Sequence, residues 1–138
     1  MLEKFDLEVY EWSVRTLRRA AGIRRFRSSL GEALHFLSCK LAEEGRHEEA
    51  LAAAEESAAL LREQLPHRPR QVGARYVNVL QLQAALLHLL DWHTRAADVG
   101  SEVLRIERRL DGRLDRGQRL AQAERDYELY RRAADMAD

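Results

Sequence analysis

The chain has 138 residues and a mass of 16.0 kDa, a length that fits one domain and is too short for two independent cores. Hydrophobic residues make up 46% and charged residues 33%, which excludes collagen-like, mucin-like and acidic disordered chains. The 23 basic and 23 acidic side chains balance, so no net charge draws the chain to nucleic acid or to an anionic membrane.

Hydrophobic periodicity predicts six helices joined by short turns. The first, over 3–21, has apolar residues on two opposite sides, which indicates neighbours on both sides. The second is expected to begin at a capping box of Ser29 and Glu32 and to end at Gly45. The remaining helices are expected over about 47–65, 70–90, 93–110 and 114–137. No segment alternates like a strand for long, so we predict a single all-α domain over 1–138.

Proline and turn residues separate these helices. Pro66 and Pro69 are expected to end the third helix, because proline cannot donate the helical hydrogen bond. Short turns are expected at 91–94 and 111–112. The longest apolar stretch, 77–90, is too short and too polar to span a bilayer, and the acidic N-terminus is unlike a signal peptide. We therefore expect a cytoplasmic protein.

Residues able to do chemistry are few. Cys39 is the one cysteine, which excludes an internal disulfide and a cysteine-based metal site, and we expect it to be a buried inert thiol. His35, one turn away on the same helix face, is the one candidate for its basic partner, so a small helical enzyme using this pair is a further hypothesis. The sequence has no glycine-rich phosphate loop, and no two histidines have the spacing that places two ligands on one helix face. We expect no catalytic residue, no metal and no cofactor.

The middle of the chain repeats with a shift of 46 residues. This shift places hydrophobic residues over hydrophobic residues and histidine over histidine. The matched pairs are Leu34 and Leu80, Leu41 and Leu87, His47 and His93, Ala50 and Ala96, Glu56 and Glu102, and Leu60 and Ile106. Each copy is a helix, a tight turn and a second helix. A single hairpin of this kind cannot bury its apolar face alone, so such units stack.

The segment LAEEGRHEEALAAAEESAALL (41–61) resembles the second half of a tetratricopeptide repeat. It is most similar to the long variety found in kinesin light chains and in large bacterial and fungal repeat proteins. Gly45 takes the place of the small residue that ends the first helix, and Ala50 that of the alanine that opens the packed face of the second. The resemblance covers 29–66 well and extends to a degenerate second copy over 70–110, with terminal helices on either side.

The resemblance implies a right-handed stack of antiparallel hairpins whose concave surface, lined by the first helices, binds a peptide or a partner domain. It therefore implies a non-enzymatic protein–protein interaction module or adaptor, either standing alone or forming part of a longer array. By the family's register, that surface carries Glu32, His35, Cys39 and Glu43 from the first repeat, and Asn78, Gln81, Ala85 and His88 from the second.

Arginines cluster where the first two predicted helices meet. Six of them lie within 13 residues with no acid between them: Arg15, Arg18, Arg19, Arg24, Arg25 and Arg27. They favour a solvated helix end, or a patch for phosphate or an acidic partner, so the alternative function is a helical regulatory module contacting nucleic acid. The patch could equally pair with the acidic run 43–56, within the chain or on a second copy.

Two apolar features are unexplained by a single hairpin stack. The two-sided first helix predicts either self-association through residues 5–17 or a neighbouring repeat that covers it. Trp92 falls in a predicted turn, where an exposed aromatic side chain would serve as an anchor for a partner.

Overall fold

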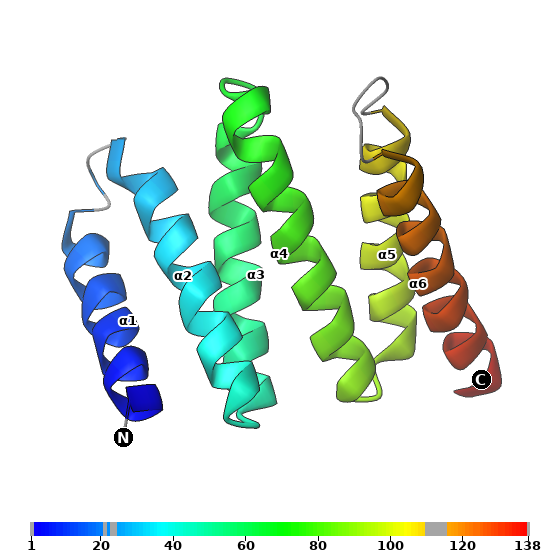
Figure 1. Cartoon of the computed structure of the whole chain (residues 1–138), viewed down its shortest axis with the longest axis horizontal. Helices are drawn as coiled ribbons and strands as arrows, with labels where there is room; N and C mark the ends of the chain where they lie inside the picture. Colours follow the sequence, from blue (N-terminus) through cyan, green and yellow to red (C-terminus); the bar gives the residue numbers. More distant parts are fainter. Residues whose placement is uncertain (1, 21, 23–24, 110–115, 138) are drawn as a thin grey trace. The chain divides into compact units, whose positions relative to one another are not determined.

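The computed structural model describes residues 2–20, 22, 25–109 and 116–137, and it places side chains for 6–20, 22, 26–109 and 117–137. Every element among them is an α-helix, which confirms the all-α prediction (Figure 1). The helices are α1 (Leu2–Arg19), α2 (Arg25–Glu43), α3 (His47–Gln64), α4 (Pro69–Leu89), α5 (His93–Arg109) and α6 (Arg116–Ala137). The chain divides into two compact units, 1–79 and 80–138, and α4 contributes to both.

The predicted start of α2 is wrong. Ser29 does not cap this helix, because α2 already begins at Arg25 and Ser29 lies within its second turn. No proline or glycine interrupts residues 25–29, so the backbone continues as a helix upstream of the capping-box pattern. Pro69 also begins α4 rather than ending α3, since proline lacks the amide hydrogen that the first helical turn leaves unused. The turn expected at 111–112 lies outside the described residues.

In the first unit, α1, α2 and α3 lie side by side in chain order (Figure 1). Leu34 of α2 is 1% exposed, and Ala50 and Ala54 of α3 are fully buried. These small side chains let the two helices approach closely. A Cβ atom added to Gly31 of α2 would lie 3.3 Å from the Leu61 side chain of α3, so the packing leaves little free space between the two helices.

Two buried serines tie α2 to α3. The Ser38 hydroxyl of α2 donates to the carbonyl of Ala50 at 2.6 Å, and the Ser57 hydroxyl of α3 donates to the carbonyl of Gly31 at 2.6 Å. Both serines are fully buried. Because a buried hydroxyl without a partner is costly, these bonds satisfy the serines and fix how the two helices face each other.

The start of α4 packs on the same unit. Tyr76 is 1% exposed, and its hydroxyl oxygen accepts a hydrogen bond from Arg62 Nε of α3 at 2.8 Å. Arg75 reaches Glu32 of α2 at 2.6 Å. These bonds connect the first part of α4 to both α2 and α3.

The second unit consists of the remainder of α4 with α5 and α6. Leu80 and Leu87 of α4 and Ala96 of α5 are essentially fully buried. Gly100 lets α5 approach α6, because a Cβ atom at this position would meet the Tyr130 ring at 3.1 Å and the Tyr127 Cα at 3.6 Å. A larger side chain there would have to displace a buried ring.

The 46-residue repeat extends to the backbone of the two turns. Gly45 and Asp91, each at the turn of its hairpin, adopt left-handed φ angles of 79° and 63°. The amide of the next residue bonds back over five positions in both turns, from Arg46 to the carbonyl of Leu41 at 2.9 Å and from Trp92 to that of Leu87 at 2.8 Å. Both helices therefore end in the same left-handed cap, and the two predicted hairpin turns are confirmed.

Substitutions at Gly45 and Asp91 should change the free energy of unfolding in opposite directions. We expect Gly45→Ala to lower the free energy of unfolding by about 1 kcal/mol, because a Cβ atom is strained at positive φ. Its Cβ would meet no atom within 4 Å, so the effect isolates the backbone angle. We expect Asp91→Gly to raise the same free energy by about 0.5–1 kcal/mol. Urea denaturation of both variants measures the pair, and a loss of stability in Asp91→Gly would contradict the strain argument.

Candidate functional site

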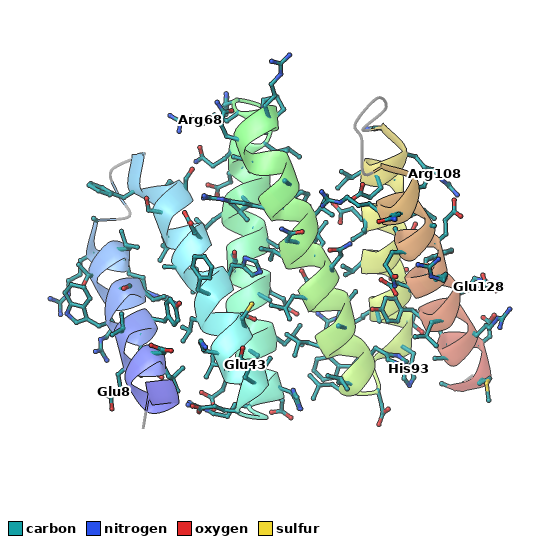
Figure 2. All side chains as sticks on the ribbon, in the orientation of Figure 1. Glu8, Glu43, Arg68, His93, Arg108 and Glu128 are labelled. Carbon is teal, nitrogen blue, oxygen red and sulfur yellow. The ribbon has the colours of Figure 1, made fainter. Side chains whose placement is uncertain are left out.

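The residues predicted to bind a partner from the first repeat share one side of α2: Glu32, His35, Cys39 and Glu43. Together with Phe36, they form what we call the α2 face. The structure adds Phe36, which lies at the centre of this set and is 43% exposed. The sequence analysis missed it, although its spacing of four residues after Glu32 and three before Cys39 places it on the same side of a helix. Glu32, His35 and Cys39 are half-buried, and Glu43 is exposed near the end of the helix (Figure 2).

Aromatic rings form the centre of the α2 face. Phe36 stacks on Tyr10 of α1, with ring centroids 5.7 Å apart and planes 23° apart. His35 lies on its other side, with centroids 6.0 Å apart and planes 14° apart. Partly exposed stacked rings offer a partner a large apolar contact at little cost in side-chain entropy.

Charged pairs surround these rings. Arg75 of α4 and Glu32 of α2 form an ion pair at 2.6 Å. At the other end of the face, Lys40 Nζ lies 3.2 Å from Glu43 and 3.8 Å from Asp6 of α1. Since these pairs are partly exposed, they contribute little to stability, and their charges are accessible to the groups of a partner.

Burial lowers the pKa of His35, and the nearby Arg75 guanidinium lowers it further, while Glu32 opposes the change. The imidazole is therefore neutral at pH 7 and has both a donor and an acceptor nitrogen.

The stability of the chain should fall as the solution is acidified. Because the folded-state pKa of His35 is below its unfolded value of about 6.5, the unfolded chain takes up this proton first. Protonation of His35 contributes nothing to the free energy of unfolding well above pH 6.5. It lowers that free energy as the pH falls through 6.5, and the loss levels off below the folded-state pKa. Thermal unfolding between pH 8 and pH 4 should show a smaller acid loss in His35→Gln. The exposed His67→Gln is the control, and an equal acid loss in both variants would contradict the assignment.

Burial raises the pKa of the Cys39 thiol, and Glu43 raises it further, while Lys40 opposes the change. The sequence predicts a buried thiol, whereas the structure places Cys39 half-buried on the α2 face and without a disulfide. A raised pKa leaves less thiolate at neutral pH, so this thiol is a weak nucleophile.

The residues predicted from the second repeat all lie on α4. Asn78 is exposed and belongs to the first unit. Gln81, Ala85 and His88 are half-buried and belong to the second. Their union with the α2 face in one concave surface stays a prediction.

A histidine pair lies beside the left-handed turn of the second unit. Nδ1 of His88, at the end of α4, is 3.1 Å from Nδ1 of His93, at the start of α5. The His88 ring also lies 5.3 Å from the Tyr130 ring, and Nε2 of His93 is 3.4 Å from an Asp91 oxygen. Two residues five positions apart do not share a face of one helix, so the sequence alone does not predict this pair. The turn at Asp91 brings the two rings together.

The predicted arginine patch is partly neutralised within the chain. Arg18 pairs with Glu56 of α3 at 2.6 Å, and Arg27 pairs with Glu63 at 2.8 Å. Pairing with the acidic run 43–56, one of the predicted alternatives, is therefore confirmed for Arg18. Arg15 and Arg19 are exposed on α1. Arg24 and the side chain of Arg25 lie outside the described part of the chain.

Two further features concern metals and membranes. Among the described side chains, no three His, Cys, Asp or Glu groups are placed to hold a metal ion together. No described helix combines the length and the hydrophobicity that crossing a membrane requires.

Trp92 is 46% exposed in its turn, as predicted, and the Arg95 guanidinium lies 5.1 Å from its ring centroid.

Comparison of the chain with protein-family models, with curated proteins and with solved structures found no match.

Proposed function

We propose that the chain is a non-enzymatic protein–protein interaction module that binds a peptide or a partner domain through the α2 face. The observation that carries the proposal is Phe36, a large apolar side chain that is 43% exposed at the centre of a ring stack. Aromatic side chains in such positions contribute strongly to protein interfaces.

The chemistry of the surroundings suggests the kind of ligand. The apolar centre fits an apolar or aromatic side chain of the partner. The flanking pairs Arg75–Glu32 and Lys40–Glu43 offer charges of both signs, which suit a segment carrying both acidic and basic residues. A carboxylate clamp is disfavoured, because His35 is kept neutral by burial and the face has no unpaired basic side chain at its centre.

A tetratricopeptide-like architecture is part of this proposal. Two helical hairpins with equivalent left-handed caps, 46 residues apart, support it. In such a module the two hairpins stack in a right-handed sense, and Asn78, Gln81, Ala85 and His88 extend the binding surface. We also propose a cytoplasmic location, in which the free Cys39 stays reduced.

Two other functions receive less support. An enzyme using Cys39 as nucleophile would need a lowered thiol pKa, and burial moves it in the other direction. A nucleic-acid module using Arg15–Arg27 would need free cations, and Arg18 and Arg27 are paired with glutamates. Steeply salt-dependent RNA or DNA binding that is lost in Arg15→Glu would favour the second of these.

Selection from a phage-displayed peptide library tests the proposed function. We expect selected peptides to bind the wild-type chain and to lose at least about tenfold in affinity to Phe36→Ser, because the variant removes the central ring. Leu129→Ser, which removes an exposed apolar side chain from the second unit, is the matched control and should bind as the wild type does. Circular dichroism confirms that both variants are folded. Failure to enrich any peptide, or equal binding by Phe36→Ser, would overturn the proposal.

A further inference from the structure

Helix α1 presents an apolar and charged side that no other described part of the first unit covers, which we call the outer face. Its members all lie within about 60° of Trp12 around a helix of 100° per residue. Those with described side chains are Glu8, Val9, Trp12, Arg15, Thr16 and Arg19. Trp12 is 60% exposed and Val9 is 41% exposed, whereas Leu7 and Val14 on the opposite side are 6% and 4% exposed. Figure 2 shows Glu8 on the side of α1 that is turned away from α2.

The charged members of this face have no ion-pair partner among the side chains that the structure describes. Neither Glu8 nor Arg15 forms an ion pair with any side chain that the structure describes. By contrast Arg18, only three residues beyond Arg15 but turned toward α3, pairs with Glu56 at 2.6 Å. The hydroxyl of Thr16 donates to the carbonyl of Trp12 at 2.9 Å, so it needs no partner from outside.

The charges of the outer face are complementary to those of a second, antiparallel copy of α1. Glu8 precedes Trp12 by four residues and Arg15 follows it by three, or about 6 Å and 4.5 Å along the helix axis. Both lie on the same flank of Trp12. If a second α1 lies antiparallel to the first with a two-fold axis at Trp12, each Glu8 comes opposite the partner's Arg15, with an axial offset of about 1.5 Å.

The other flank behaves in the same way. Val9 lies about 4.5 Å before Trp12, and Thr16 lies about 6 Å after it, so the same two-fold axis sets each valine beside the partner's threonine. A parallel pair with its two-fold axis between the helices would instead place Glu8 beside the partner's Val9 and Arg15 beside the partner's Thr16, so neither charge would gain an opposite one. A two-fold axis requires one surface patch to complement itself, and the outer face does so only in the antiparallel orientation.

We propose that two copies of this chain associate through the outer faces of α1, antiparallel, with the Trp12 side chains at the two-fold axis and reciprocal Glu8–Arg15 ion pairs beside them. This surface lies on the side of α1 away from the α2 face, so the proposal goes beyond partner binding and does not depend on it.

Sedimentation equilibrium over a range of protein concentrations tests this pairing. We expect the mass of the wild-type chain to rise from 16.0 kDa toward twice that value as concentration increases. Glu8→Arg and Arg15→Glu should each weaken association by at least about tenfold, because each sets like charges opposite one another twice. The double variant Glu8→Arg with Arg15→Glu restores the opposite pairs and should associate nearly as the wild type does. Trp12→Ser should remain monomeric.

Controls separate this result from general effects of charge and from loss of folding. Glu124→Arg makes the same charge change at an exposed site on α6 and should associate as the wild type does. Circular dichroism establishes that each variant is folded. A wild-type chain that is monomeric at all concentrations would overturn the proposal, and so would association that is unaffected by Trp12→Ser or not restored in the double variant. Peptide binding by the α2 face is measured separately, so either proposal can fail without the other.

Discussion

Leu34→Ala should lower the free energy of unfolding by about 2–5 kcal/mol, the largest effect we expect of a single truncation. Leu34 is 1% exposed in α2 and lies between Gly31 and Ser38, both of which contact α3. Truncation removes buried methyl groups, and the tightly packed helix pair can collapse only partly into the cavity that remains. Urea denaturation followed by circular dichroism gives the free-energy difference.

Leu89→Ala is the matched control for this truncation. The same atoms are removed from a side chain that is 60% exposed, so the change in unfolding free energy should stay within about 0.5 kcal/mol. Similar losses in the two variants would mean that Leu34 does not occupy the core.

Gly100→Val should lower the free energy of unfolding by about 1–3 kcal/mol, because it introduces atoms where α5 and α6 touch. The added Cβ atom would lie 3.1 Å from the Tyr130 ring. That ring is 7% exposed and packs against His88, so it has little room to move. The Tyr127 backbone closes the other side. Thermal and urea unfolding both measure the loss.

Gly73→Ala provides the contrast to Gly100→Val. Gly73 also lies within a helix, α4, but a Cβ atom there would meet no atom within 4 Å. Alanine has the higher helix propensity, so this substitution should raise the unfolding free energy by about 0.5–1 kcal/mol. Equal destabilisation by both substitutions would show that the close approach at Gly100 is not what limits the side chain there.

Most of the local structure of this chain could be predicted from its sequence. Gly45 and Asp91 lie at the two turns that the 46-residue repeat predicts, and five of the six helices begin within two residues of their expected starts. These features depend on nearby residues, through glycine and proline geometry and hydrophobic periodicity. The predicted start of α2 is wrong, because the Ser29–Glu32 pattern is equally compatible with the interior of a helix.

The candidate site was less predictable, because its contacts join distant residues. The family register selected His35 and Cys39, but the stacking of Phe36 on Tyr10 depends on how α1 lies against α2. In the same way, the pairing of Arg18 with Glu56 joins residues 38 positions apart. Such pairs depend on helix packing, which residue types and spacing do not specify.

The two serine hydrogen bonds between α2 and α3 have a consequence for motion within each hairpin. The positions 46 residues after Ser38 and Ser57 are Ala84 and Val103, whose side chains have no hydrogen-bonding group. Sliding α2 along α3 would therefore break two buried polar contacts, whereas equivalent sliding at the corresponding positions of α4 and α5 would break none. At these positions the first hairpin therefore resists axial slippage through buried polar contacts that the second hairpin lacks, and these contacts hold the helix that carries the α2 face.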